Sequence, residues 1–541
     1  MTTSPAADLL IRAGTVHTLA TTPDRSAAPV TALAVRDGRI AATAGPGAER
    51  DLLSAWRGAD TVVLDEPGLT VLPAFTDTHN HLMLAARNIL GVPVSQARDI
   101  AGIIALIRDR AARTPPGDWI VTAADWHELQ LAERRLPTAA ELDQATADHP
   151  VLLPRGGHNA VLNSAGLRAA GFGPGTPDIP GGFIARDAAG QPSGWLQDSA
   201  LDLARRALPQ LPEDALIAGL TRASAQYAAH GLVTVRDPAV SAQEWPAYQR
   251  APLSVRSHAM IMTTPGAVTA AGSVDAYLDG LEEQGLRPGA GHGRLRLWGL
   301  KFVLDGGVEA AALSEPYTDR PAYRGELIWD PGELTSALAV CARRGWPVGT
   351  HAMGDHAVAV LLDAIRAARL PSGPQLVVEH GGLIAGRIAD AAELGVHITV
   401  QQALLDGLGP AFLAAWGPGR TSALFPWREL ASAGAWISAG TDHPIGPLDP
   451  LRAVHGMTTR LTPAGSLGPE HAISRAEAIR LYTVAGAGFL GAQPDAPSGL
   501  VPGAPADLVA YPADPFTCPD DQLLELTPAA TILGGQLTYS R

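Results

Sequence analysis

The chain has 541 residues, of which 46% are hydrophobic, so it is long enough for one large barrel with additions or for several smaller units. Its net charge of −14 without a basic cluster argues against a nucleic acid partner, and its apolar runs are too short to span a membrane. Two distant cysteines and an N-terminus without a signal-peptide pattern lead us to expect a cytoplasmic protein without a disulfide framework.

Short strands are predicted at both ends of the chain. Residues 1–70 contain four β-type segments, two of them joined by the turn dipeptide Asp37-Gly38. Residues 491–541 contain three more, with Gly534-Gly535 as a second hairpin turn. Each set alone would leave an open sheet edge, so we expect the two ends to pair in one composite β-sandwich domain.

The residues between these ends, 71–490, predict an α/β fold, a (β/α)8 TIM barrel. A gap of roughly 150 residues after the first strand is far longer than a βα loop and has strands and helices of its own, which predicts an inserted subdomain at about 95–212. Alternation of strands with helices is typical of the barrel. The eight predicted barrel strands are Val71–Asp77, Leu232–Asp237, Ser254–Ile261, Leu295–Leu304, Pro347–His351, Leu376–His380, Val396–Gln401 and Trp436–Asp442.

Residues that can bind metal ions recur where these strands end, which is the face where barrel enzymes place their active sites. His79 and His81 are two residues apart, a spacing that points both imidazoles to the same side of an extended chain. A shared site explains the whole set better than separate structural roles. The candidate metal ligands are His79, His81, Lys301, His351, His380 and Asp442.

Lys301 is the only lysine in the chain, although arginine is used freely as a cation. Arginine would supply positive charge as well, but only a primary amine can lose its proton when buried. A neutral amine can add carbon dioxide, and the resulting carbamate is a carboxylate-like bridge between two metal ions. We therefore predict a carbamate on Lys301; the alternative is a structural lysine at a strand end.

Counting ligands predicts two divalent ions. His79, His81 and Asp442 can bind one, the histidines of the fifth and sixth strands can bind the other, and the carbamate of Lys301 and a hydroxide would bridge them. Mixed nitrogen and oxygen ligands make zinc the expected metal, while manganese, iron and nickel fit the same donors. Water between two such ions becomes a nucleophile, with Asp442 as the expected general base.

The motifs Thr76–Leu82, His351–Asp355, Glu379-His380 and Gly440–Asp442 together resemble the amidohydrolase superfamily in its binuclear form with a carboxylated lysine. More narrowly, the chain resembles amidohydrolase family 3, which includes N-substituted formamide deformylases and YtcJ-like proteins. The resemblance runs nearly end to end and implies a barrel with a composite β-sandwich. The segment Gly307–Ala312 departs from the Ser-Leu-Gly-rich continuation frequent in the family, so the deformylase assignment is weaker than that of the superfamily.

Side chains from the insert and from the loops after the strands are expected to contact the substrate. For several of them a structural role explains the sequence equally well, and His158 is included on the family resemblance. The segment Glu309–Trp329 is either a lid or a long surface loop. The candidate substrate-binding residues are Trp126, Arg155, His158, Asp305, Tyr317 and Gln401.

Together, the residues and the resemblance predict a metal-dependent amidohydrolase that cuts an amide-type C–N bond, such as that of an N-substituted amide or formamide, in a small molecule. One alternative is a mononuclear deaminase of the same superfamily, which would not need the bridging lysine. Another is a non-catalytic scaffold that keeps the fold without the metals. A monomer and a homodimer are both compatible with the size and acidic charge of the chain.

Overall fold

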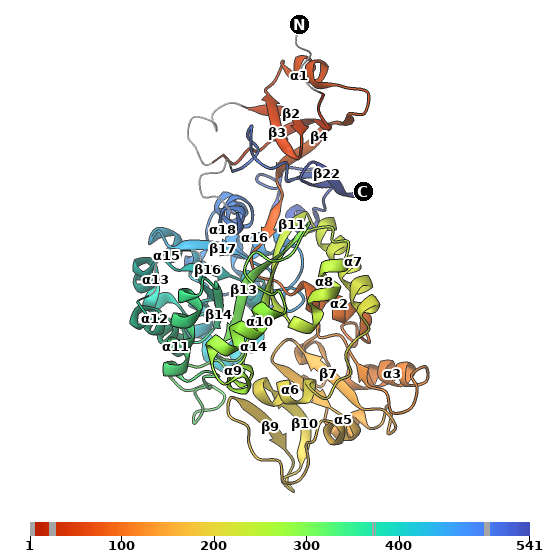
Figure 1. Ribbon diagram of the computed structural model, residues 1–541, viewed down its shortest axis with the longest axis vertical. Helices are drawn as coiled ribbons and strands as arrows, with labels where there is room; N and C mark the ends of the chain where they lie inside the picture. Colours follow the sequence, from red (N-terminus) through yellow and green to blue (C-terminus); the bar gives the residue numbers. More distant parts are fainter. Residues whose placement is uncertain (1–5, 21–28, 370–372, 374, 492–497) are drawn as a thin grey trace.

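The computed structural model describes residues 6–20, 29–369, 373, 375–491 and 498–541. Figure 1 shows a β-sheet with both chain termini at one end, a barrel surrounded by helices in the middle, and an additional α/β segment at the other end. Within the described residues, no helix is both long and apolar enough to cross a membrane.

The sheet at the termini has seven strands in the order β22-β21-β20-β4-β1-β2-β3, so strands from the two ends of the chain are hydrogen-bonded neighbours. The central contact is the antiparallel pair of β4 and β20, where Val71 is opposite Ala510. The strands are β1 (Leu9–Val16), β2 (Val30–Arg36), β3 (Arg39–Ala44), β4 (Val62–Pro73), β20 (Leu508–Tyr511), β21 (Ala530–Leu533) and β22 (Gln536–Ser540).

This sheet curls over its own core and does not divide into two separate sheets. One apolar cluster contains Leu33 and Val35 of β2 together with Ile532 of β21, although these strands lie far apart in the sheet order. Ile40 of β3 also donates a backbone hydrogen bond to Ala504 at 2.9 Å, next to β20. The pairing predicted between the two chain ends is therefore present, in one continuous curled sheet.

Both predicted hairpin turns are confirmed. Arg36 is paired with Arg39 across Asp37-Gly38, whose φ angles are 50° and 72°. The second turn, Gly534-Gly535, has φ angles of 56° and 76° and joins β21 to β22. Positive φ at both central residues matches the right-handed twist of the strands and is tolerated best by Gly, Asn and Asp.

The barrel predicted from the sequence is confirmed. Its eight strands are parallel and follow one another in chain order. The backbone N–H of Thr78, just after the first strand, donates to the carbonyl of Ala439 in the last strand at 3.2 Å, which links the two ends of the sheet. The strands are β5 (Phe75–Asp77), β11 (Leu232–Val240), β12 (Arg256–Met262), β13 (Leu295–Val303), β14 (Val348–Ala352), β15 (Leu376–His380), β16 (His397–Val400) and β17 (Trp436–Ala439).

The first barrel strand is shorter than the predicted Val71–Asp77. Residues up to Pro73 belong to β4 and pair with β20, and only Phe75–Asp77 pairs with β11. The apolar run continues through the junction because it serves two cores: Val71 packs in the core of the terminal sheet, and Leu72 packs in that of the barrel. Periodicity alone therefore gave no boundary between the two sheets.

Helices surround the barrel, and several begin with local capping interactions. The clearest example is α11, where the Asp330 side chain accepts hydrogen bonds from the backbone N–H groups of Gly332 and Glu333. The helices outside the insert are α1 (Glu49–Trp56), α2 (Leu82–Leu90), α7 (Glu213–Ala229), α8 (Trp245–Arg250), α9 (Pro265–Ala271), α10 (Val274–Glu283), α11 (Pro331–Arg343), α12 (Asp355–Ala367), α13 (Ile388–Leu394), α14 (Gln402–Ser422), α15 (Trp427–Ser432), α16 (Pro450–Thr459), α17 (Arg475–Arg480), α18 (Gly486–Leu490) and α19 (Asp520–Glu525). A small hairpin of β18 (Leu461–Thr462) and β19 (Gly465–Ser466) follows α16.

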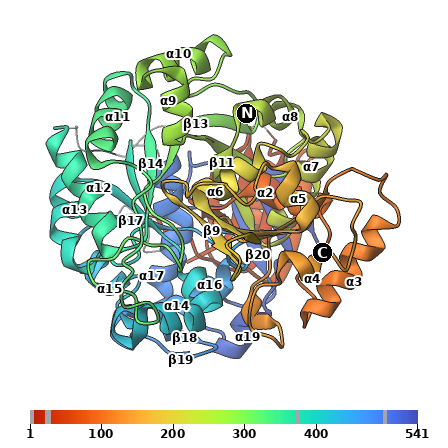
Figure 2. The ribbon, with the colours of Figure 1, turned by 90° about the horizontal axis from the view of Figure 1, so that it is seen from below.

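The long segment between α2 and α7 forms a five-stranded sheet in the order β6-β7-β8-β10-β9. It has two apolar clusters of its own, one around Ile103 and Val151 and one around Leu162 and Leu196. Figure 2 shows α6 and β9 in front of the barrel mouth. The elements are α3 (Ile100–Ala111), β6 (Ile120–Val121), α4 (Ala139–Leu142), β7 (Val151–Arg155), β8 (Asn159–Leu162), α5 (Ser164–Ala169), β9 (Gly182–Arg186), β10 (Pro192–Gln197) and α6 (Asp198–Arg205).

Replacement of Phe75 tests whether the junction of the two sheets holds the fold together. Phe75 is fully buried, with its ring near those of Tyr482 and Tyr511. We expect Phe75→Ala to lower the free energy of unfolding by about 3–5 kcal/mol, because it removes a buried ring and leaves a cavity. Urea unfolding followed by circular dichroism measures the change.

The matched control is Phe183→Ala in β9, because the Phe183 side chain is exposed. It should change the free energy of unfolding by about 0.5 kcal/mol or less. Equal effects of the two substitutions would show that the junction has no special weight in the stability of the fold.

Candidate active site

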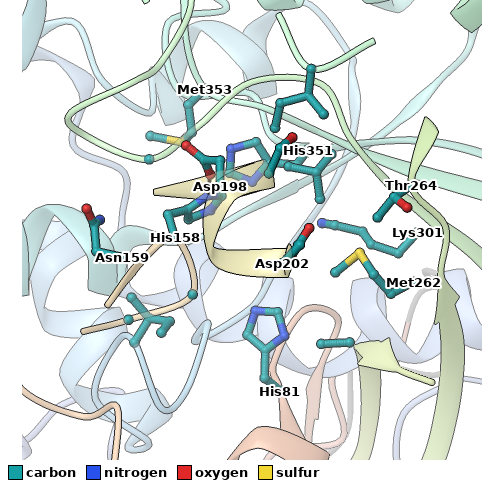
Figure 3. A pocket seen from close by; sticks show the side chains of 18 of the residues that line it. His81, His158, Asn159, Asp198, Asp202, Met262, Thr264, Lys301, His351 and Met353 are labelled. Atoms are coloured by element: carbon teal, nitrogen blue, oxygen red, sulfur yellow. Dashed lines mark hydrogen bonds and ion pairs between the residues drawn. The ribbon is translucent and has the colours of Figure 1, made fainter. Parts of the chain in front are cut away.

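The six candidate metal ligands line one cavity at the carboxyl ends of the barrel strands. Lys301, His351 and His380 lie within the strands β13, β14 and β15, respectively. His79 and His81 lie in the turn after β5, and Asp442 lies in the turn after β17. Figure 3 shows His81, Lys301 and His351 around this cavity. The expected ligands are thus brought together by the closure of the barrel.

His79, His81 and Asp442 form the tightest part of the cluster. The Nε2 atoms of His79 and His81 lie 3.3 and 2.9 Å from Oδ1 of Asp442. One ligand atom from each residue lies within 4.8 Å of the others, which is a suitable spacing for one metal ion. The prediction placed both histidines on an extended strand, but they follow the end of β5. Their imidazoles nevertheless converge on Asp442.

Asp77, the last residue of β5, holds the two turns together. Its carboxylate accepts hydrogen bonds from the backbone N–H groups of His79 and Thr441, both at 3.1 Å, and from the Thr441 hydroxyl at 2.5 Å. Burial raises the pKa of Asp77 to about 6, although these hydrogen bonds oppose the shift. The first and last turns of the barrel are therefore fixed to the same buried carboxylate.

The imidazoles continue as a row across the cavity floor. The ring of His380 lies 4.6 Å from that of His79 and 4.5 Å from that of His351, measured between centroids. Burial lowers the pKa values of His351 and His380 well below the usual range, which favours the neutral rings that metal binding requires. Burial also lowers the pKa of Lys301 to about 8.

Two of the candidate ligands have a backbone conformation that is uncommon outside glycine. His380 has a φ of 70° and Asp442 a φ of 57°. Such conformations cost about 1–3 kcal/mol each and persist only where the surrounding structure fixes them. Their location at two of the six cavity-floor positions supports a functional role for this part of the fold.

The donors on the floor fit divalent metal ions. Lys301 Nζ and His380 Nδ1 are buried without a hydrogen-bond partner. A buried polar atom without a partner costs about 1–3 kcal/mol, and coordination to a metal, directly or through a carbamate, would remove that cost. Imidazole nitrogen and carboxylate oxygen are the donors expected for zinc and related ions.

Glu379 supports this floor from below. Its carboxylate accepts a hydrogen bond from Nδ1 of His79 at 2.5 Å and two from Arg236 at 2.6 and 2.7 Å. Burial opposes ionisation of Glu379, but Arg236 and His79 hold its pKa well below the usual range. The bond at Nδ1 leaves Nε2 of His79 as the atom that faces Asp442, which is the common arrangement of a carboxylate, a histidine and a metal.

Arg236 has no role in the prediction from the sequence, and Glu379 enters that prediction only as part of a family motif. Both are charged and fully buried, in strands whose other residues are mostly apolar. A buried charge requires a partner, so their presence in β11 and β15 was a usable signal for an internal ion pair. Nothing in the sequence showed that these two residues pair with each other.

The cavity above the floor has a volume of about 670 Å³. This is within the usual range for small-molecule sites. Two of the predicted substrate-binding residues, Arg155 and His158, reach its lining from the insert. The insert therefore forms part of the wall around the candidate metal centre.

His158 is held by a partner that the sequence did not reveal. Its Nδ1 lies 2.6 Å from Oδ1 of Asp198, at the start of α6, and its ring lies 5.1 Å from that of His351. Burial opposes the charged form of His158, but Asp198 outweighs it and raises the pKa. Figure 3 shows His158 beside Asp198 and His351. Because Nδ1 contacts Asp198, Nε2 is the ring nitrogen that can contact a bound molecule.

Arg155 joins the insert to the barrel. Its guanidinium lies 2.5 Å from Oε1 of Glu309 and 2.9 Å from Oε2 of Glu128. His127, Glu128 and Glu309 are close enough for a metal ion, but Arg155 is already paired with both carboxylates of this group. Burial opposes ionisation of Glu309, whereas Arg155 lowers its pKa to about 2.

The other four predicted substrate-binding residues are buried and do not line the cavity. Asp305 accepts hydrogen bonds from the backbone N–H groups of Ala312, Met353 and Gly354, and the Tyr317 hydroxyl donates to the Ala311 carbonyl. Asp305 and Tyr317 thus hold the loops that follow β13 and β14. The four residues are Trp126, Asp305, Tyr317 and Gln401.

The segment Glu309–Trp329 borders the cavity at both of its ends, since Glu309 and Trp329 line it. Trp329 is stacked on Phe302, with the ring centroids 4.7 Å apart. The segment is thus part of the cavity wall, and the choice between a lid and a long surface loop stays a prediction.

Comparison with known proteins found matches to a family model, to related sequences and to solved structures. The model of the Amidohydrolase family matches residues 63–539. The YtcJ protein of Bacillus subtilis is 28% identical, covering 98% of both chains, and an N-substituted formamide deformylase of Arthrobacter pascens is 29% identical, covering 94% of this chain and 95% of its own. An uncharacterised metal-dependent hydrolase from Pyrococcus horikoshii has a similar fold, with a TM-score of 0.73 and 23% identity over 95% of this chain and 99% of its own.

Gly349 offers a test of the support below the floor. A Cβ atom at this position would lie 2.0 Å from Oε1 of Glu379, so Gly349→Ala must displace the carboxylate from Arg236 and His79. We expect the affinity for zinc to fall about 10–100-fold, as is typical when the partner of a metal-binding histidine is lost. Titration with zinc against a competing chelator measures the affinity.

The matched control is Gly280→Ala in α10, where a Cβ atom would meet nothing within 4 Å. It should leave the zinc affinity unchanged, and circular dichroism should show both variants folded. Native zinc affinity in a folded Gly349→Ala protein would contradict the supporting role of Glu379.

Proposed function

The chain belongs to the amidohydrolase family, and on this basis we propose that it is a metal-dependent hydrolase that cuts an amide-type C–N bond of a small molecule. The observation that carries the proposal is the convergence of six nitrogen and oxygen donors on the floor of one cavity, with Lys301 Nζ and His380 Nδ1 buried and unpaired.

His79, His81 and Asp442 would hold one divalent ion, and the imidazoles of β14 and β15 would hold a second. Lys301, as a carbamate, would bridge the two. Zinc suits these donors, and two such ions supply a polarised substrate carbonyl and water of lowered pKa. The neutral state of Lys301 that carbamate formation requires is favoured by its burial.

Asp442 is the proposed proton carrier. Burial opposes its charge, but the close imidazoles of His79 and His81 hold its pKa well below the usual range, which favours an ionised acceptor. Its Oδ1 faces the two imidazoles, which leaves Oδ2 to take a proton from water and return it to the leaving nitrogen.

The insert would position the substrate. His158 can donate a hydrogen bond from Nε2, because Asp198 occupies Nδ1 and favours the charged ring. The ion pair between Arg155 and Glu309 would close the wall between insert and barrel and restrict the entry of water. A mononuclear deaminase would give Lys301 no role on the cavity floor, so the binuclear hydrolase accounts for more of the site.

Metal content tests the role of Lys301. We expect about two equivalents of metal in the native protein, and a carbamate carbon signal by NMR after incubation with ¹³C-labelled bicarbonate. Lys301→Arg should fold, lose the signal and bind fewer metal ions, because a guanidinium does not form the carbamate.

Full activity and two bound metal ions in Lys301→Arg would remove the lysine from the mechanism. One equivalent in both proteins would favour the mononuclear deaminase. A protein that neither contains metal nor takes it up from added zinc or manganese would favour the non-catalytic scaffold.

Asp442→Asn separates metal binding from proton transfer. The variant should keep at least one equivalent of metal while kcat falls by about 10²–10⁴-fold, because an amide side chain does not accept the proton. Asp60→Asn is the matched control, since Asp60 is exposed. Turnover near the native rate in Asp442→Asn would assign the proton transfer to another group.

A further inference from the structure

Two apolar walls rise from the floor of the cavity. We define the β12–β13 wall as Met262 of β12, Val303 of β13 and Trp329 of the segment that follows β13. We define the α14 wall as Leu404, Leu408 and Phe412. All six residues line the same cavity as the candidate metal ligands. Each wall can therefore contact an apolar group of a molecule whose reacting bond lies on the floor.

The topology of the barrel places these walls on opposite sides of the mouth. β12 and β13 are the third and fourth barrel strands, whereas α14 directly follows β16, the seventh. In a closed ring of eight strands, the third and fourth are opposite the seventh and eighth. Figure 2 shows β13 and α14 on opposite sides of the ring. The row of imidazoles lies between the walls.

Packing fixes both walls. Phe412 contacts Trp416 edge to face at 4.8 Å, and the Trp416 indole donates to the carbonyl of Val308 at 2.8 Å. Trp329 is stacked on Phe302, at an interplanar angle of 22°. Side chains held in this way provide contact area without a large loss of conformational entropy on binding.

We propose that the substrate is an amide with an apolar group on both sides of the scissile C–N bond: an acyl chain of several carbons and an apolar N-substituent. This inference rests on the proposed amide hydrolysis. A formamide has only hydrogen on its carbonyl carbon, so it would leave one wall without contact. The cavity, at about 670 Å³, has room for both groups.

The test is a series of N-benzyl amides with formyl, acetyl, butanoyl and hexanoyl groups, hydrolysed by the metal-loaded enzyme. Each kcat/KM is divided by the rate constant of alkaline hydrolysis, to remove differences in intrinsic reactivity. We expect this ratio to rise about fourfold for each added methylene and at least tenfold from formyl to butanoyl. A ratio that is highest for the formyl amide and falls with acyl length would overturn the inference.

Substitutions in the two walls test whether each wall contacts a different group of the substrate. Of Phe412→Ala and Met262→Ala, one should weaken the dependence of the kcat/KM ratio on acyl length. The other should weaken its dependence on the size of the N-substituent, measured in a butanoyl series from N-methyl to N-benzyl. Phe412→Leu gives a milder version if the alanine variant does not fold. Leu461→Ala, at an exposed leucine of β18, should change neither series.

Other outcomes separate the inference from the function on which it rests. If the wall variants affect the same side or neither side, the walls do not receive two groups and the inference is overturned. If only formamides are hydrolysed, amide hydrolysis stands and the two-sided substrate is excluded. If the metal-loaded protein cleaves no amide, the proposed function fails and the inference fails with it.

Discussion

The candidate metal centre depends on one buried ion pair. Arg236 of β11 and Glu379 of β15 are fully buried, and the carboxylate also accepts a hydrogen bond from His79. Either charge alone would be costly in the barrel interior, so the two strands must be brought together before His79 can be oriented. Gly349 between them leaves the space that the carboxylate fills. Closure of the barrel and orientation of the ligand are therefore one structural requirement.

The barrel and the insert supply different parts of the proposed site. The barrel strands and the turns that follow them supply the cavity floor, with its histidines and Lys301, whereas the insert supplies part of the wall through His158 and Arg155. The two parts are joined by the contact of Arg155 with Glu309, which lies in the segment that departs from the family pattern. Changes in the insert can thus alter the pocket without moving the floor, which is how one fold serves different substrates.

The terminal sheet is connected to the site through the chain itself. β4 leaves the sheet at Pro73, and β5 begins two residues later and leads to His79. Phe75 lies at this junction, near Tyr511 of β20 and Tyr482. Pairing of the two chain ends therefore fixes the start of the strand that leads to the first candidate metal ligands, which gives the distant C-terminal strands an indirect role in the site.

Local patterns in the sequence determined the eight strands, the turns at Asp37-Gly38 and Gly534-Gly535, and the set of candidate ligands, because strand periodicity, turn preference and ligand chemistry depend on neighbouring residues. Tertiary structure alone decided that the terminal strands form one curled sheet, that Arg236 pairs with Glu379, and that Asp198 holds His158. It also placed Gln401 outside the cavity lining. These features depend on which segments far apart in the sequence come together in the folded chain, and the physical cause is long-range packing, which a local pattern does not encode.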